Sequence, residues 1–284
     1  MSASRRLGAV LVGAALITTA CTSDIVEPDS NAAPSFSVVE GLDLEAPEAS
    51  NHFVVFKGKV PNDLADEVTA LGGQVEALYE DVGVAVFSGL DDVDARDLKR
   101  ATRAQHVELE PMVMMDNPMG APEVVAYDGE ITSPDDPTTA GWFPAQWNMR
   151  AIGAPEAWAA GRLGDPGTTV AILDTGIDYD YPDLVGRVDL SRSVSFLPVD
   201  DFYVDLFFPG RHPITDLHYH GTHVASTVAS NGNVIAGVTS GVTLVGIKVC
   251  SVLGGCPGSA IFAGVAHAIA IEADVANMSL GGSF

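Results

Sequence analysis

The chain has 284 residues, enough for about two domains, and 47% of them are hydrophobic, which is sufficient for a packed core. Its 14 Lys and Arg residues stand against 38 Asp and Glu residues, so the formal net charge is −24 at pH 7. A surface this acidic repels nucleic-acid phosphates and anionic lipid headgroups, and we therefore expect no nucleic-acid partner.

The first 21 residues have the pattern of an export signal. Two arginines precede an apolar run over residues 7–20, which is too short for an ordinary membrane-spanning helix and ends in small residues before Cys21. The Thr-Thr-Ala-Cys run at 18–21 resembles a bacterial lipoprotein cleavage site, although Thr18 stands where such sites usually carry an aliphatic residue. We expect an exported protein, extracellular or in the cell envelope, with a lipid anchor at Cys21. The alternative is plain secretion after ordinary signal cleavage.

A flexible tether and then a compact module follow the signal. Residues 22–50 are rich in Pro, Ser, Ala and acidic residues, which favours a tether. Residues 51–115 alternate strand and helix patterns. In chain order, we expect a strand at 52–57, a helix at 63–71, strands at 74–79 and 82–87, a helix at 92–101 and an extended segment at 106–115. This β-α-β-β-α-β order is the ferredoxin-like plan, which does not by itself fix a function.

The apolar spacing of the two helices predicts which of their faces are buried. Leu64, Val68 and Leu71 share one face of the first helix. In the second helix, we expect Val93 and Leu98 to point inward.

The composition changes twice after this module. Residues 116–145 are polar and Pro-rich, which predicts a linker or an exposed arm. Residues 146–284 alternate apolar strands with helical patterns, which indicates a parallel α/β sheet. The expected buried strands are 170–173, 244–249 and 275–278, and the expected helices are 220–230 and 259–272. Functional sites in such sheets form beyond the carboxyl ends of the strands.

The first chemical motif is a carboxylate at a strand end, in the sequence Val170-Ala-Ile-Leu-Asp174-Thr-Gly176. The strand delivers Asp174 to the carboxyl edge of the sheet, where the carboxylate can orient a catalytic histidine. One alternative is an Asp that caps the next helix. Another is the Asp-Thr-Gly of an aspartic protease, which would require a homodimer because this chemistry needs two Asp residues and the motif occurs once.

The second motif gathers three histidines in His218-Tyr-His220-Gly-Thr-His223. In one interpretation, His220 is a general base at the start of a helix and His223 packs beside it. In the other, all three histidines bind zinc in a hydrolase. The spacing resembles part of the zinc motif of the metallo-β-lactamase fold, but Thr222 stands where that family has an acidic residue.

The third motif and the cysteines are less specific. Small residues in Asn277-Met-Ser-Leu-Gly-Gly282 and at Gly254-Gly255 allow another backbone to approach closely, but each could be an ordinary turn. If Cys21 is lipidated, Cys250 and Cys256 form an even pair that could close a short disulfide loop. They could equally be buried free thiols.

Together, the motifs in the order Asp174-Thr-Gly, His220-Gly-Thr-His and Asn277-Met-Ser-Leu-Gly-Gly resemble the subtilisin-like serine proteases. The resemblance runs from about residue 146 to the end. It implies a doubly wound, parallel subtilisin-like sheet and a serine endopeptidase that acts on polypeptide substrates. Residues 51–115 look like the inhibitor-type propeptide of this family, which assists folding and then occupies the cleft as an intramolecular partner.

The resemblance also assigns roles to individual residues. Asp174 would orient the imidazole, and His220 would be the general base. The residues that would contact the substrate are Gly254, Gly255, Ser279, Leu280 and Gly281.

The chain departs from the family pattern at several positions. The family's serine lies in a Gly-Thr-Ser-Met-Ala motif that opens a later helix. The family's Asn that stabilises the oxyanion also lies beyond the strand that leads into Ser279. Neither occurs before Phe284, so we expect a precursor truncated before its nucleophile and inactive alone. Tyr219 stands where Gly often precedes the catalytic His, and Ser226 stands where Gly often follows Val-Ala.

Two further features lie between or near the motifs. Asp174 and His220 are 46 residues apart, and the intervening chain contains an aromatic insertion at 202–208 that would shape substrate access or simply pack. Asp183 matches a position that binds calcium in some relatives. Because the loop at 231–237 is too short for their full calcium loop, we expect no metal and no other cofactor.

The rival hypotheses predict different geometries. The protease interpretation places an Asp174 carboxylate oxygen about 2.6–3.2 Å from His220 Nδ1. The zinc interpretation places three histidine nitrogens about 2.0–2.1 Å from one point, and we expect His218 to diverge instead. A third hypothesis is a peptide-binding protein that keeps the cleft without a nucleophile.

Overall fold

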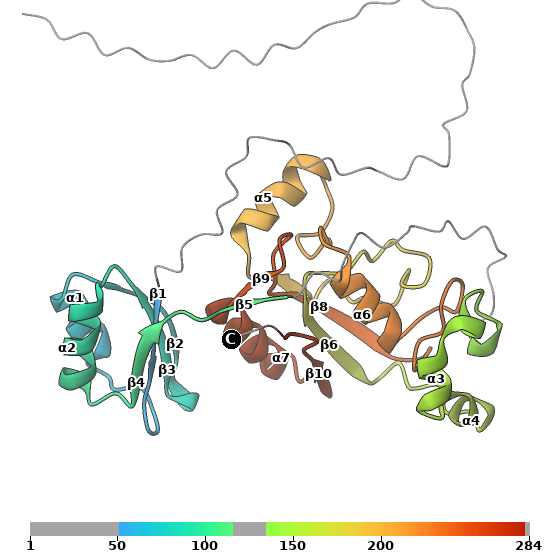
Figure 1. The fold of residues 1–284 in the computed structure, drawn as a ribbon, viewed down its shortest axis with the longest axis horizontal. Helices are drawn as coiled ribbons and strands as arrows, with labels where there is room; N and C mark the ends of the chain where they lie inside the picture. Colours follow the sequence, from blue (N-terminus) through green and yellow to red (C-terminus); the bar gives the residue numbers. More distant parts are fainter. Residues whose placement is uncertain (1–50, 116–134, 282–284) are drawn as a thin grey trace, which may run out of the picture. The chain divides into compact units, whose positions relative to one another are not determined.

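The computed structural model describes residues 51–115 and 135–281 (Figure 1). The predicted signal segment, Cys21, the tether and most of the predicted linker lie outside these residues. Within the described ranges, no helix is both long and apolar enough to cross a membrane.

Residues 51–115 form an antiparallel sheet with two helices. The elements are β1 (Asn51–Val55), α1 (Leu64–Ala70), β2 (Gln74–Tyr79), the 3-10 turn η1 (Glu80–Val82), β3 (Val84–Ser88), α2 (Asp92–Thr102) and β4 (His106–Leu109). The strand order β2-β3-β1-β4 is that of the ferredoxin-like plan. The core of this module gathers Val54, Leu64, Val68, Phe87 and Leu98.

The inward face of α2 differs from the prediction. Asp91 caps the helix by accepting hydrogen bonds from the N–H groups of Val93 and Asp94. The buried residues are Ala95 and Leu98, whereas 56% of Val93 is exposed, so its predicted inward position is wrong. Val93 and Leu98 are five positions apart and therefore point in different directions at 3.6 residues per turn.

The extended segment at 106–115 is divided into two strands. β4 ends at Leu109, and β5 (Met112–Met114) begins after Pro111, which has no backbone N–H to continue the ladder. β5 instead pairs antiparallel with β9 (Gly255–Pro257), far along the chain.

Part of the predicted linker is packed against the α/β region. The 3-10 turns η2 (Pro137–Thr139) and η3 (Phe143–Ala145) precede α3 (Trp147–Ala151) and α4 (Ala154–Ala159). Ala140 is buried in one cluster with Met149, Trp158 and Ala236. Ala140, which lies in the predicted linker, therefore packs with residues of the α/β region, because apolar residues between the prolines have a core to join.

A four-stranded parallel sheet organises the rest of the chain. Its strands are β6 (Thr169–Asp174), β7 (Val194–Ser195), β8 (Thr243–Lys248) and β10 (Val275–Asn277), in the order β10-β6-β8-β7. The helices that follow β6 in the chain are α5 (Pro198–Phe207), α6 (His220–Val228) and α7 (Gly258–Ala270) (Figure 1).

Alternating strand residues bury both faces of this sheet. Val170, Ile172 and Leu244 pack with residues of α6 on one face. Ala171, Leu173 and Ile247 pack with residues of α7 on the other. This is the doubly wound α/β arrangement, and it directs the carboxyl ends of all four strands to one edge.

β10 is less buried than predicted. Among the described strands it pairs with β6 alone, and 50% of Val275 is exposed. An apolar run by itself does not distinguish a central strand from an edge strand.

Candidate active site

Asp174 is the last residue of β6 and is fully buried. Its Oδ1 accepts a hydrogen bond from the Thr175 N–H at 2.7 Å and lies 2.8 Å from His220 Nδ1. Its backbone carbonyl accepts the N–H groups of Val249 and Cys250, at 2.9 and 3.1 Å, so the end of β8 holds this backbone in place. The carboxylate is therefore fixed at the carboxyl edge of the sheet.

The turn after Asp174 requires a glycine. Gly176 has φ +111°, and a Cβ added there would lie 2.4 Å from the Ile214 carbonyl oxygen. This close approach brings the segment that precedes α6 against the end of β6.

His220 is the first residue of α6, and 28% of its side chain is exposed. The hydrogen bond to Asp174 raises the pKa of His220, and partial burial of the imidazole opposes that rise. Because Asp174 occupies the Nδ1 side, Nε2 is the nitrogen left to exchange a proton with a reacting group.

Asp216 organises the start of α6, and the sequence interpretation missed it. Its carboxylate accepts the N–H groups of His218, Tyr219 and Thr222, at 2.9, 3.0 and 2.9 Å. It also accepts the hydroxyls of Thr222 and Thr175, at 2.6 and 2.9 Å. An acidic residue just before a predicted helix is a capping signal, and that signal was available in the sequence.

The three histidines of the second motif do not converge. The ring of His218 stacks on Tyr219, with centroids 4.7 Å apart, and its centroid lies 6.5 Å from that of His220. Burial lowers the pKa of both His218 and His223. Over residues 51–115 and 135–281, no group of three His, Cys, Asp or Glu side chains is arranged to hold a metal ion. This geometry does not support the zinc hypothesis.

Asp183 holds backbone N–H groups in an arrangement that does not fit calcium. Its Oδ1 accepts from Asn233 N at 2.6 Å and from Val234 N at 3.0 Å, and its Oδ2 accepts from Ile235 N at 2.9 Å. Calcium requires six to eight oxygen ligands, whereas these N–H donors point at the carboxylate and would repel a cation. The short loop therefore closes on Asp183 itself.

The loop between β8 and α7 carries an edge that binds an extended chain. Cys250 and Cys256 form a disulfide around this loop, which resolves the alternatives that their spacing left open. Gly255 and Cys256 pair with Met114 and Val113 in the β5–β9 ladder. The Met115 N–H continues the ladder by donating to the Gly254 carbonyl at 3.0 Å.

Further contacts join residues 51–115 to the start of α7. Glu110 is buried, and its Oε1 accepts the Ser259 N–H at 2.5 Å. The neighbouring Gly258 N–H donates to the Pro111 carbonyl at 2.9 Å. The rings of Phe53 and Phe262 lie 5.2 Å apart. Glu110 places its carboxylate at the N-terminus of α7, which is electrostatically favourable. The contacts between the two regions are therefore both polar and apolar.

The third motif lies at the end of β10. Ser279 and Gly281 are exposed, and Leu280 packs against the cluster that contains the disulfide. The Asn277 amide donates to the Ser279 hydroxyl at 3.0 Å. The role of this motif in substrate binding stays a prediction.

The aromatic insertion forms α5, which a buried ion pair anchors to β8. Lys248 Nζ lies 3.1 Å from Asp200 Oδ2, and both side chains are almost completely buried. Asp200 Oδ2 also accepts the Val252 N–H at 3.0 Å, which links α5 to the disulfide loop. Phe202 and Phe207 are 62% and 61% exposed, so this insertion is only partly packed.

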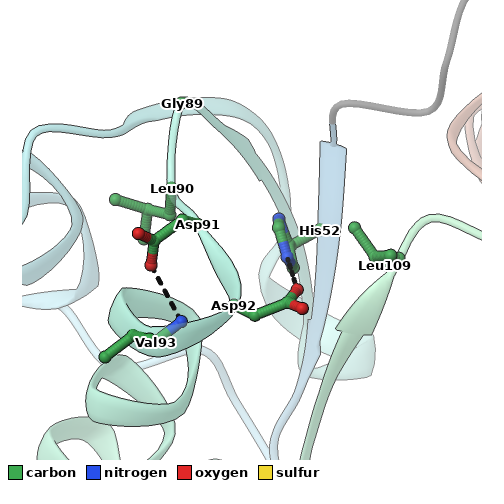
Figure 2. Close-up of a pocket in the computed structure, with 7 residues that line it drawn as sticks. All are labelled: His52, Gly89, Leu90, Asp91, Asp92, Val93 and Leu109. Carbon is green, nitrogen blue, oxygen red and sulfur yellow. Dashed lines mark hydrogen bonds and ion pairs between the residues drawn. The ribbon is translucent and has the colours of Figure 1, made fainter.

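A separate hollow in residues 51–115 is lined by His52, Leu109 and the turn that leads into α2 (Figure 2). His52 stacks on Phe87 with ring centroids 5.3 Å apart, and its Nε2 lies 3.9 Å from Asp92 Oδ1. The hollow is distinct from the Asp174–His220 pair.

The fold and the site together define the class of protein. A doubly wound parallel sheet presents a hydrogen-bonded Asp–His pair at its carboxyl edge, beside a loop that pairs with an extended chain. This is a subtilisin-like α/β fold.

Comparison with known proteins agrees with this class. Residues 165–284 match the Subtilase family. The chain is 41% identical to the minor extracellular protease Vpr of Bacillus subtilis (strain 168) over 132 residues, which are 46% of this chain and 16% of Vpr. It is 28% identical to subtilisin E of the same organism over 219 residues, 76% of this chain and 47% of subtilisin E. The chain thus spans less than half the length of either relative.

Two solved structures share the fold. Fervidolysin from Fervidobacterium pennivorans, a keratinolytic enzyme, superposes with a TM-score of 0.59 at 22% identity, over 81% of this chain and 35% of the other. The epidermin leader peptide processing serine protease from Staphylococcus aureus superposes with a TM-score of 0.58 at 18% identity, over 81% of this chain and 49% of the other.

Proposed function

We propose that this chain is the precursor of an exported, subtilisin-like serine endopeptidase that cleaves peptide bonds in proteins. The observation that supports this most directly is the 2.8 Å contact between Asp174 Oδ1 and His220 Nδ1 in a subtilase domain. The nearby Gly254–Cys256 edge already pairs with an extended segment, the geometry in which a substrate backbone would be held.

In the proposed mechanism, His220 acts through Nε2 as the general base. It takes the proton from a serine hydroxyl as that oxygen attacks the peptide carbonyl, and it later returns the proton to the leaving amine. Asp174 keeps the proton on Nδ1 and stabilises the imidazolium. The serine is a residue that these 284 do not supply in a Gly-Thr-Ser-Met-Ala motif.

Residues 51–115 are proposed to be an inhibitory propeptide. Their β5 strand and Met115 occupy the edge on which a substrate would lie, and Glu110 caps α7. The match to subtilisin E covers 76% of this chain and therefore extends N-terminal to the subtilase domain. Export follows from the signal pattern, and Cys21 is the proposed site of lipid attachment.

Activity measurements on two proteins test the proposed function. The first is residues 1–284, and the second is the same chain extended by the downstream coding sequence through an in-frame Gly-Thr-Ser motif. We expect the extended protein to hydrolyse a fluorogenic peptide in a fluorophosphonate-sensitive manner. We expect no such turnover by residues 1–284, since loss of the serine alone costs a factor on the order of 10⁶ in subtilisin.

Two variants of the extended protein are the controls. Asp174→Asn and His220→Ala should each reduce turnover by several orders of magnitude. Fluorophosphonate-sensitive turnover by residues 1–284 would contradict the proposal. An extended protein that binds peptides without cleaving them would indicate the peptide-binding alternative.

A further inference from the structure

Tyr219 has the most unusual backbone among the described non-glycine residues. Its φ is +97° and its ψ is −31°, directly before His220. The other two non-glycine residues with positive φ, Arg103 and Glu272, have φ near +55°, in the ordinary left-handed region. A bulky side chain at φ +97° is strained, and such strain persists only where the surroundings enforce it.

Asp216 enforces this conformation. Its Oδ1 accepts the N–H groups of His218 and Tyr219, and its Oδ2 accepts the N–H of Thr222 in the first turn of α6. A glycine would satisfy the same hydrogen bonds without strain. The hydrogen bonds therefore explain how the strained turn is held but do not explain why the residue is a tyrosine.

The ring of Tyr219 packs on the ring of His218. It stacks on His218 with centroids 4.7 Å apart and planes inclined by 15°, and 38% of Tyr219 is exposed. His218 lies beside the strand-binding edge, because a Cβ added to Gly254 would be 3.6 Å from His218 Nε2. The same Cβ would be 3.6 Å from the Cβ of Met115, the last described residue of the bound segment. A Cβ at Gly254 would therefore contact both residues, which places His218 and Met115 around the same glycine.

The bound segment turns alternate side chains toward the protein. Val113 and Met115 pack against the cluster that contains the disulfide, whereas 47% of Met114 is exposed. Met115 therefore faces inward beside Gly254, the residue that His218 also adjoins. An unbranched thioether or aliphatic side chain suits such a place, because it adapts to ring faces and gains sulfur–aromatic or apolar contact.

We propose that His218 and Tyr219 form an aromatic subsite that recognises an unbranched apolar side chain at the position held here by Met115. The inference deepens the proposed function and rests on it for the extension to substrates. In the endopeptidase, the subsite selects methionine-like or leucine-like residues at the matching position of a substrate strand. Tyr219 is a specificity residue and not a member of the catalytic pair.

Hydrogen exchange on the intact 284-residue chain tests the subsite without requiring catalysis. In Tyr219→Gly, we expect the Met115 amide to exchange about 3–10-fold faster, the range expected for loss of an aromatic contact. The melting temperature should stay equal or rise, since the backbone strain is relieved. Tyr219→Phe keeps the ring and should exchange like the parent, and Tyr203→Ala on α5 is the matched control at a remote aromatic.

A double-mutant cycle ties the effect to the Met115 side chain. Met115→Ala should accelerate exchange to a similar extent, and Met115→Ala combined with Tyr219→Gly should add little beyond either single change. Unchanged Met115 exchange in Tyr219→Gly, fully additive effects, or a lower melting temperature with uniformly faster exchange would each overturn the subsite. Because no step needs turnover, failure of the serine-protease proposal is recognised separately by the activity assay.

Discussion

At the scale of single residues, the Asp174–His220 contact combines full burial with partial exposure. Asp174 is enclosed at the end of β6, while His220 keeps 28% of its side chain accessible. The hydrogen bond to Asp174 raises the pKa of His220, and desolvation opposes that rise. A base with a raised pKa accepts a proton readily but is neutral only at higher pH.

We predict that Asp174→Asn lowers the pKa of His220, measured by NMR titration of the imidazole. A raised folded-state pKa contributes stability that is complete below the unfolded value of about 6.5 and is lost as the pH rises through the folded value. The variant should therefore lose more stability at about pH 5.5 than at about pH 8.5. Asp178→Asn, which alters a carboxylate paired with Arg211, is the control. An unchanged His220 titration in Asp174→Asn would refute this account of the pair.

At the scale of secondary-structure elements, a buried ion pair joins α5 to β8. Lys248 is the last residue of β8 and the register partner of Asp174. Its ammonium group donates to the Thr215 carbonyl at 2.9 Å and contacts Asp200 of α5. Burial is the main cause that raises the pKa of Asp200, and Lys248 counteracts it. The pair therefore connects three segments around the site.

Removing one partner of this ion pair should destabilise the folded protein. Lys248→Met leaves a buried, unpaired carboxylate, and we expect it to lower the free energy of unfolding by about 3–5 kcal/mol. Adding Asp200→Leu should recover much of that loss, because the apolar pair needs no charge compensation. Urea unfolding of the two variants and the parent measures the effect. A double variant as unstable as Lys248→Met would show that the ion pair itself is not the cause.

At the scale of the whole molecule, residues 51–115 contact the α/β region through strand pairing, a capped helix and apolar rings. Glu110 is central to these contacts because it is buried and accepts hydrogen bonds from Ser259 N and from the Asn51 amide. Such charge-assisted hydrogen bonds are stronger than neutral ones.

We predict that the separately expressed module 51–115 inhibits the extended, processed enzyme. Glu110→Ala should weaken this inhibition by at least about 10-fold, since hydrogen bonds to charged groups contribute roughly 1.5–3 kcal/mol. Glu108→Ala, at an exposed acid of β4 two residues before Glu110, should inhibit like the parent module. Inhibition constants from peptide turnover measure the difference. Lack of inhibition at micromolar concentrations would identify the module as an unrelated domain.

The sequence by itself determined the features that rest on local pattern. The alternation and apolar spacing of residues 51–115 indicated the ferredoxin-like order, and the alternation of apolar strands with helical patterns from residue 146 onward indicated a parallel α/β sheet. These signals are readable because strand and helix periods, glycine turns and caps act between near neighbours. They also singled out Asp174 and His220 as candidates, without giving the distance between them.

Only the tertiary structure decided what depends on residues far apart in the chain. It placed Asp174 against His220 across 46 residues, and it closed the loop at 233–235 on Asp183. It also packed Ala140 against the α/β core. It showed that Asp216 accepts backbone N–H groups at the start of α6. None of these contacts leaves a periodic signal in the sequence, because each arises when the sheet edge brings separate loops together and buried polar groups must find partners there.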